Sequence, residues 1–435
     1  MQPSGRLSDV YLDPAGRQGA YDFVESPHIS WCALLKSAQT ACARRATEYP
    51  FVFVPVDDTS LTLVDPERTK DFGFVGNKRY DRRGMKVIDA LAVSPKGTPL
   101  GLAALYWWAR TSPREKAPGS RKVKDKETVH WLETVKDVAT CFASEAPNTR
   151  LWFQVDRGGD GAHLLRQLSS TGQLFTVRSN ADRRLHSDQR VFLRAYVARQ
   201  RPIGHFSVDV PGTNRRTART ARLAVRACTV VLRLQDKWTK QRWAFSVGVV
   251  HAHEVSRVPR KEKALDWMLL TNHSVATLKD ARLVLFGYTQ RWRIEDFHRT
   301  WKSAGCDVET TQLRKQRHVL VWATLLAAVA ARVERLKHLS REQPELPASV
   351  ELSPTEIEAL MLLKRRYKKR TESIPKTMPS IAQATLWIAE LGGYTGKSSG
   401  GPPGSITISR GLQFLKPAAA LLDVLAPRQK SRNVR

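Results

Sequence analysis

Residues 288–305 read YTQRWRIEDFHRTWKSAG and carry four polar side chains at regular spacing. Arg291, Glu295 and Lys302 follow Tyr288 at offsets of 3, 7 and 14 residues. At about 3.6 residues per turn, these positions fall on one stripe of a single helix. The apolar residues between them lie on another side, where they can face a core. The segment therefore predicts a helix, within a longer helical pattern at 275–303, that presents a carboxylate between two cations and a phenol.

This stripe has two interpretations. Phosphodiester chemistry needs a carboxylate that holds a metal ion and cations that hold phosphates, and Glu295 with Arg291 and Lys302 offers that combination. From spacing alone, the segment is equally an ordinary amphipathic helix with a solvated charged face. His298 lies one turn after Glu295, and we interpret it as a helix-face histidine rather than a metal ligand.

Two aspartates stand directly after apolar runs that predict buried strands. FVFVPV at 51–56 precedes Asp57, and LWFQV at 151–155 precedes Asp156. Ligands gather at the carboxyl ends of strands in open α/β sheets. Two aspartates there, together with Glu295 on a helix, supply the hard oxygen ligands that Mg²⁺ prefers. A metal site for in-line phosphoryl transfer is one prediction from these positions.

Other roles remain open for the same residues. Strand-end aspartates also cap turns, which explains Asp57 and Asp156 without a metal. Asp58 competes with Asp57 for the first ligand position. Pro55 lies inside the first apolar run, and because proline cannot donate to a strand ladder, we expect a bulge or an early end there.

The order of elements predicts an α/β fold. Three strand-like runs, a helix, a strand, a helix and a strand follow one another at 51–56, 86–93, 99–107, 123–145, 151–155, 161–170 and 175–178. This is the order of an RNase H-like catalytic core, a mixed sheet flanked by helices. Two β patterns, at 222–234 and 244–255, predict an all-β subdomain inserted at about 180–265.

We expect three parts along the chain. Residues 1–48 form an N-terminal helical segment, 49–316 the catalytic core with its insertion, and 317–435 an α-helical C-terminal domain with a basic tail. The apolar run at 319–331 is short for a membrane span and is typical of a buried helix. No signal peptide is recognised at the N-terminus.

Composition favours a nucleic-acid partner. Of 435 residues, 71 are Lys or Arg and 41 are Asp or Glu, which gives a net charge of +30 spread over the whole chain. Such a field attracts polyanions, and DNA gains affinity through counterion release. The 5 cysteines are scattered and form no C-x-x-C, which indicates a reducing compartment and argues against a disulfide scaffold or a zinc ribbon.

The segment at 288–305 resembles the Y-R-E-K signature of bacterial DDE transposases of the IS4 group, the Tn5 type, and WMLLTN at 267–272 extends the likeness. Other segments that are similar to the family follow in the family's order. They are GAYDFVESPHIS at 19–30, DDTSL at 57–61, VDR at 155–157 and VRS at 177–179. The resemblance covers roughly residues 19–425.

The resemblance implies a role for each matching residue. Asp57, Asp156 and Glu295 would be the catalytic residues and would bind Mg²⁺, with Mn²⁺ able to substitute. Trp267 would stack on a base flipped out near the transposon end, since aromatic stacking offsets the cost of unstacking. The contacts to DNA phosphates would come from Arg178, Tyr288, Arg291 and Lys302.

The implied function is metal-dependent cleavage at transposon ends and strand transfer into target DNA, a cut-and-paste reaction with a hairpin intermediate. The implied partners are double-stranded transposon ends, target DNA and a second copy in a synaptic homodimer, without a membrane, in the cytoplasm and on the bacterial nucleoid. Fewer residues precede Gly19 than in the family, which keeps an alternative open: a non-catalytic DNA-binding or dimerising regulator. A nuclease without strand transfer is a third possibility.

Overall fold

The computed structural model describes residues 4–11, 13–65, 67–76, 82–110, 127–187, 190–210, 212, 217–236, 239–368, 372–375, 377–396 and 401–425 of the chain. Its centre is a mixed sheet whose strands are β1 (Phe51–Thr62), β3 (Arg82–Val93), β4 (Pro99–Trp108), β5 (Arg150–Val155) and β6 (Leu174–Arg178). β1 pairs antiparallel with β3 and parallel with β5, while β3 pairs antiparallel with β4 and β5 parallel with β6. This arrangement confirms the mixed α/β architecture and is consistent with an RNase H-like core.

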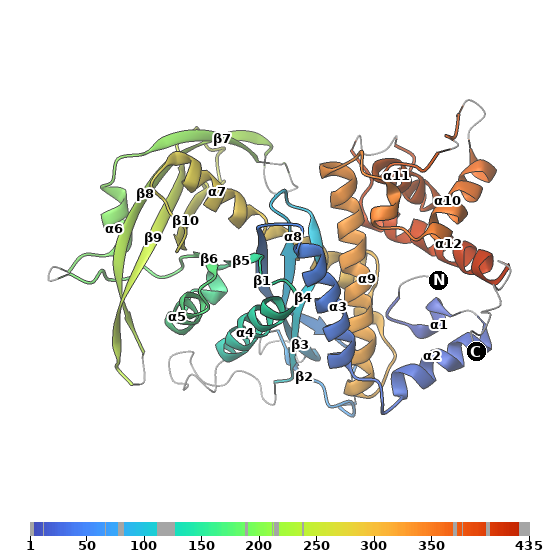
Figure 1. The fold of residues 1–435 in the computed structure, drawn as a ribbon. Coiled ribbons are helices and arrows are strands. Elements are labelled where there is room, and N and C mark those ends of the chain that lie inside the picture. The colour runs from blue at the N-terminus through green and yellow to red at the C-terminus, as the bar shows by residue number, and fades with distance from the viewer. Residues whose placement is uncertain are drawn as a thin grey trace, which may run out of the picture.

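Helices cover both faces of this sheet because its central strands are apolar on both sides (Figure 1). One face packs against α4 (Thr128–Glu145) and α5 (Ala162–Ser170). The other face packs against α7 (Leu278–Thr289), α8 (Trp292–Arg299) and the first part of α9 (Gln316–Glu342). The short strand β2 (Gly73–Val75) extends the sheet beside β3. The active-site candidates on α7 and α8 therefore lie on one face of the sheet.

Pro55 does not interrupt β1, contrary to the expectation of a bulge or an early strand end. The strand runs through it, and Pro55 is the parallel partner of Gln154. Phe53 pairs with Val93 and Val56 with Ala90, so the register on the other side does not shift. Pro55 removes one N–H donor from the strand ladder. The packing of a strand that is buried on both faces outweighs the loss of this one hydrogen bond.

The insertion differs from the expected all-β subdomain. It contains the helix α6 (Leu193–Ala198), and its strands continue the central sheet. β10 (Asp266–Thr271) pairs antiparallel with β6, and β9 (Arg242–Glu254), β8 (Arg219–Gln235) and β7 (Gly204–Val210) follow outward. The result is a 10-stranded sheet, because the edge of β6 offers backbone donors and acceptors that β10 satisfies.

The helical pattern at 275–303 is not one helix. α7 ends at Thr289, α8 begins at Trp292, and residues Thr300–Ala304 form a π-helical turn (η4). At the break, the N–H of Arg291 donates to the oxygen of Tyr288 at 3.1 Å, three residues back, which tightens the backbone. The side chains of the predicted stripe are thus set by two helices and a wider turn, which periodicity alone does not reveal.

The remaining helices lie at the two ends of the chain. α1 (Leu7–Val10), α2 (Pro14–Glu25) and α3 (Trp31–Ala46) precede the sheet. The 3-10 turn η5 (Val308–Thr310) precedes α9. After α9 come the 3-10 turn η6 (Ala348–Val350), α10 (Pro354–Tyr367), α11 (Ile381–Leu391) and α12 (Ser405–Leu425). No described helix is both long and apolar enough to cross a membrane. The predicted basic tail lies outside the described residues.

α9 joins the core to the C-terminal helices. Its residues up to Ala331 belong to the main hydrophobic cluster, and those from Val333 onward pack with α10, α11 and α12 (Figure 1). The apolar run at 319–331 is therefore a buried helix, as its length predicts. The sequence pattern did not predict where α12 begins and ends, and this helix contains Pro417.

Gly411 tests the packing of the C-terminal helices. A Cβ at this residue of α12 would lie 1.6 Å from the carbonyl oxygen of Ile388 on α11. We expect Gly411→Ala to lower the free energy of unfolding by about 1–3 kcal/mol, as overpacking usually does. Gly19→Ala is the control, since Gly19 lies in α2 with nothing within 4 Å of a Cβ, and it should stabilise slightly. Chemical denaturation followed by circular dichroism measures both, and equal effects would contradict this packing.

Candidate active site

Asp57 and Asp156 lie side by side at one edge of the sheet. Val56 and Val155 are partners in the parallel ladder of β1 and β5, so the aspartates that follow them are neighbours. β5 ends at Val155 as predicted, but β1 continues to Thr62, because its pairing with β3 extends past the apolar run. Asp57 therefore lies within its strand and not after it. The side chain of Asp57 is 14% exposed. Asp156 accepts a hydrogen bond at Oδ1 from the N–H of Gly158 at 2.7 Å, which fixes the turn after β5. Asp156 is thus both the turn cap that residue type predicts and a neighbour of Asp57.

Arg291 connects Asp57 to Glu295. Its Nη1 donates to Oδ2 of Asp57 at 2.7 Å, and its Nη2 donates to Oε1 of Glu295 one helical turn away. The side chain of Arg291 is 9% exposed, so its charge is buried between the two carboxylates. A planar guanidinium with several donors suits such bridging. The contact joins the middle of β1 to the start of α8.

Burial changes the protonation of the Asp57 carboxyl. Burial raises the pKa of Asp57 to about 7; Arg291 opposes this rise, and Asp156 and Asp89 add to it. The pKa of Arg291 is raised as well, because burial lowers it less than Asp57 and Glu295 raise it. Carboxylates that repel one another in a buried site are a common setting for a bound cation.

Asp58 does not share this environment. Adjacent residues of a strand point to opposite faces. Oδ2 of Asp58 pairs with Nζ of Lys86 on β3 at 2.5 Å, and the Asp58 side chain is 43% exposed. Of the two candidates for the first ligand, Asp57 is the one that contacts the bridging arginine.

Arg178, Trp267 and Tyr288 form a second group at the same edge. Arg178 ends β6, and its Nη2 donates to the backbone oxygen of Asp266 at 3.0 Å, next to Trp267 at the start of β10. The rings of Trp267 and Tyr288 meet edge to face, with centroids 6.2 Å apart. Burial raises the pKa of Tyr288, while Arg178 and Arg291 oppose the rise, so the phenol lies near both arginines.

Lys302 reaches β1 from the π-helical turn. Its Nζ donates to the backbone oxygen of Ser60 at 2.7 Å and to Oγ1 of Thr59 at 3.4 Å. It also lies 3.6 Å from a carboxylate oxygen of Glu309. The residues named from the sequence therefore gather at one end of the sheet, although Lys302 contacts the strand beyond Asp57 and not Glu295.

A buried pair that the sequence did not reveal supports the site. Nε2 of His298 lies 2.8 Å from Oδ1 of Asp89, which is fully buried on β3 and is the cross-strand partner of Asp57. The pKa of His298 is raised, since burial lowers it but Asp89 raises it more. His298 thus faces the sheet and binds Asp89, whereas we expected a histidine on the helix surface. Asp89 is a charged residue inside the apolar run of β3, and this position alone could have indicated that it has a buried partner.

The carboxylates are suited to a divalent cation but are not drawn tightly together. Among the described residues, two other groups bring three possible ligand atoms within 4.8 Å of one another: His251, His253 and Asp266, and Asp296, Glu334 and His338. Asp57, Asp156 and Glu295 do not form such a group, and the guanidinium of Arg291 lies between two of them. Their hard oxygen donors fit Mg²⁺ or Mn²⁺, and Arg291 marks where positive charge is needed.

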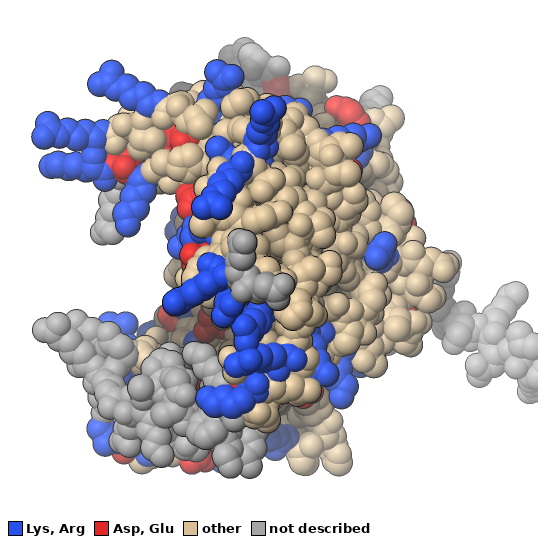
Figure 2. Space-filling view, turned by 90° about the vertical axis from the view of Figure 1, so that its left-hand side faces the viewer, with Lys and Arg blue, Asp and Glu red and all other residues tan. Residues whose placement is uncertain are grey.

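The surface on the insertion side of the molecule is basic. Figure 2 looks onto the insertion side of the molecule, where the exposed charged side chains are mostly Lys and Arg and several of them border a hollow. The acidic residues described above lie within a chain whose net charge is +30. Such a surface attracts a polyanion toward an acidic centre that needs cations.

Comparison with known families gives two adjoining matches. The family model described as Transposase DDE domain matches residues 126–331, and the one described as Transposase Tn5 dimerisation domain matches residues 328–420. The first match includes Asp156, Arg178, Trp267 and the segment 288–302, and begins after Asp57.

Together with the mixed sheet, the matches support a DDE transposase, an enzyme class with nuclease chemistry that generally uses a divalent metal. The DDE domain followed by this dimerisation domain supports the Tn5 and IS4 type.

The raised pKa of Asp57 gives a test on stability. The pKa of Asp57 is 3.8 in a free chain and about 7 in the folded protein. The folded state therefore favours the protonated carboxyl, and this contribution to the free energy of unfolding is complete below about pH 4. It is lost as the pH rises through about 7. Asp57→Asn keeps the side chain neutral. Without metal, we expect the variant to exceed the wild type in free energy of unfolding by about 1–3 kcal/mol at pH 8 and to match it near pH 4.

Denaturant titrations in EDTA at the two pH values measure this difference. Asp58→Asn is the matched control; it removes the ion pair with Lys86 and should gain nothing at pH 8. A gain for Asp57→Asn that is the same at both pH values would show that its carboxyl is not perturbed.

Proposed function

We propose that this protein is a DNA transposase that cleaves DNA at transposon ends and transfers the freed 3′ ends to target DNA, by cut-and-paste with a hairpin intermediate. The observation that carries the proposal is the Arg291 bridge between Asp57 of β1 and Glu295 of α8, beside Asp156. The two family matches support the same class. The spacing of Tyr288, Arg291, Glu295 and Lys302 adds the resemblance to the Y-R-E-K signature.

In this proposal Asp57, Asp156 and Glu295 are the catalytic residues and hold Mg²⁺, with Mn²⁺ able to replace it. Bound there, divalent ions supply activation of the attacking hydroxyl and neutralisation of the leaving oxygen in an in-line displacement. Asp57 is favoured over Asp58 as the first ligand because Asp58 is paired with Lys86 outside the bridge. Arg291 holds Asp57 and Glu295 near each other by its own charge.

The neighbouring residues would bind and orient DNA. Arg178, Arg291 and Lys302 carry permanent positive charge near the carboxylates, and phosphate oxygens are their natural partners. Tyr288 would donate its hydroxyl to a phosphate. Trp267 is partly exposed and is held edge to face against Tyr288, so one side of its ring is supported for stacking on an unpaired base.

The C-terminal helices would mediate a homodimer on paired DNA ends. α12 lies within or just beyond the match to the dimerisation domain and exposes several apolar side chains. They are Phe414, Leu421, Val424 and Leu425. We propose the same three-part division as before, with residues 1–48 assisting end recognition, 49–316 as the core and 317–435 as the dimerisation region, in a protein that works on the bacterial nucleoid.

Cleavage of DNA tests the catalytic proposal. The purified chain is incubated with Mg²⁺ or Mn²⁺ and linear DNA that carries the inverted repeats flanking its gene. We expect cuts at the repeat boundary, reduced by a factor of about 10³ or more in Glu295→Ala and Asp57→Asn, because positioning and charge neutralisation account for most of such catalysis. Asp58→Asn is the matched control and should retain cleavage.

Each contrary result has a definite meaning. DNA binding or dimer formation without cleavage by the wild type would overturn the enzyme proposal and favour the regulator of transposition. Cleavage without joining of the 3′ ends to target DNA would favour a nuclease. Loss of activity in Asp58→Asn, with activity kept in Asp57→Asn, would show that Asp58 and not Asp57 is the first metal ligand.

The dimer can be tested separately. Leu421→Glu combined with Val424→Glu places charge on the exposed apolar face of α12. We expect the dimer dissociation constant to rise by a factor of about 10 or more, as for loss of apolar interface anchors. Val64→Glu introduces the same charge at an exposed valine outside the C-terminal helices. Sedimentation velocity measures the dimer dissociation constant of the wild type and of both variants. An unchanged dissociation constant in the α12 variant would place the interface elsewhere.

A further inference from the structure

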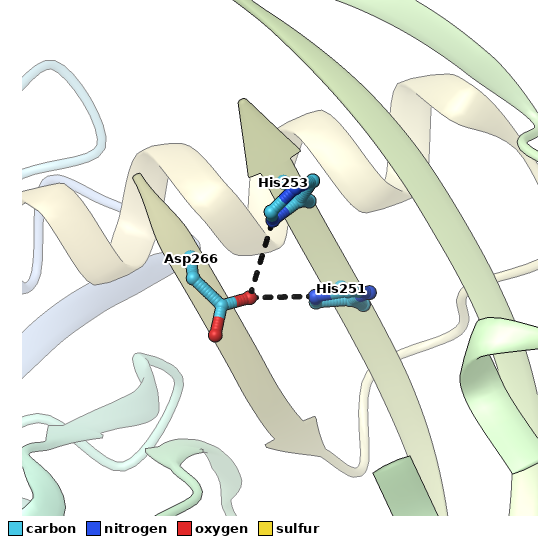
Figure 3. A group of neighbouring side chains, drawn as sticks. All are labelled: His251, His253 and Asp266. Atoms are coloured by element: carbon cyan, nitrogen blue, oxygen red, sulfur yellow. Dashed lines mark hydrogen bonds and ion pairs between the residues drawn. The ribbon is translucent and has the colours of Figure 1, made fainter. Parts of the chain in front are cut away.

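His251, His253 and Asp266 form a compact group in the insertion. His251 and His253 lie two residues apart on β9, so their side chains share one face of the strand. Asp266, the first residue of β10, is the cross-strand partner of His253. Figure 3 shows the two imidazole rings and the carboxylate directed toward one another from the neighbouring strands. Their ligand atoms all lie within 4.8 Å of one another.

One carboxylate oxygen faces both rings. Nε2 of His251 lies 2.7 Å from Oδ1 of Asp266, and Nδ1 of His253 lies 3.8 Å from the same oxygen. Nδ1 of His251 is buried and has no hydrogen-bond partner among the described residues. No acceptor or donor in the described part of the chain fixes the tautomer at Nδ1, so the neutral ring can carry its proton on Nδ1 and present the lone pair of Nε2 to a cation.

The charge on Asp266 suits a cation ligand. Oδ1 of Asp266 lies between the two imidazoles, and a carboxylate oxygen is one of the ligand types that Zn²⁺ accepts beside imidazole nitrogen. Arg194 lies 3.5 Å from Oδ2, the other oxygen. Oδ1 is therefore the oxygen that remains directed at the two imidazoles.

We propose that His251, His253 and Asp266 bind a transition-metal ion of the Zn²⁺ class on the outer part of the sheet. Two imidazole nitrogens and one carboxylate oxygen match the ligand preference of Zn²⁺, Co²⁺ and Ni²⁺, whereas Mg²⁺ prefers oxygen alone. The side chains of His253 and Asp266 are 45% and 39% exposed, so an ion can enter and complete its coordination with water.

The other compact group does not offer such a site. Asp296, Glu334 and His338 lie close together, but the ammonium of Lys337 pairs with Glu334 and lies 3.4 Å from Asp296. A lysine already supplies the positive charge there, and a second cation would be repelled. In the group at His251, Arg194 contacts the outer oxygen of Asp266, and Arg178 contacts only the backbone oxygen of that residue.

The position of the proposed ion gives it a structural consequence. It would link β9 to β10 at the residue directly before Trp267, whose ring contacts Tyr288. An ion there would fix the start of β10. Its effect on DNA binding rests on the proposed function of Trp267, but the binding of the metal itself does not.

Metal binding is measured on the full chain without a histidine tag, after dialysis against EDTA, at pH 7.5. Zn²⁺ is titrated by calorimetry, and Co²⁺ by its visible absorption, which reports nitrogen and oxygen ligands. We expect one Zn²⁺ per chain at this site, with its dissociation constant raised at least roughly tenfold in His253→Asn and in Asp266→Asn. Circular dichroism checks that these variants fold.

Three control variants separate this site from other ligands. Asp57→Asn removes the proposed catalytic site, Cys32→Ser removes an exposed thiol and His205→Asn removes a histidine of β7, and none of them should change Zn²⁺ affinity. No Zn²⁺ binding by the wild type, or equal affinity in wild type and His253→Asn, would overturn the proposal. Loss of binding in Asp57→Asn alone would assign the ion to the catalytic carboxylates and likewise overturn it.

Discussion

The buried guanidinium of Arg291 is the contact on which the site depends. It bonds Asp57 within a central strand and Glu295 on a helix from much later in the chain. These two contacts join α8 to the sheet. Burial still raises the pKa of Asp57 to about 7, although Arg291 opposes the rise.

α8 is supported from two sides. Toward the sheet, His298 binds Asp89 beside Asp57. Toward the C-terminal helices, Oγ1 of Thr300 donates to Oε1 of Glu334 on α9 at 2.6 Å, and the same oxygen accepts a hydrogen bond from Ser405 of α12. The helix that carries Glu295 therefore has polar contacts both with the core and with the helices that match the dimerisation domain. Such connections fix its position more narrowly than apolar packing alone, because hydrogen bonds are directional.

Much of the fold was predictable from local patterns. The apolar runs at 51–56 and 151–155 lie in β1 and β5, and the aspartates that follow them lie together because Val56 and Val155 are partners in the parallel ladder. The continuation of β1 to Thr62 was not predicted. The break between α7 and α8 was not predictable, since helical periodicity continues through it. The extension of the core sheet by β10 was also hidden, because strand patterns do not specify which edge they join. Asp89 and His298 were missed as a pair because their separation in the chain is large.

The sequence by itself determined the element types, the basic character and the residues capable of phosphodiester chemistry. These properties depend on residue type, spacing and charge, which act locally or add over the whole chain. Only the tertiary structure decided that Arg291 bridges Asp57 and Glu295, that Asp58 turns to Lys86, and that two strands bring His251, His253 and Asp266 together. These are contacts between distant segments, and they exist only when packing of the whole sheet and its helices fixes the register and direction of each side chain.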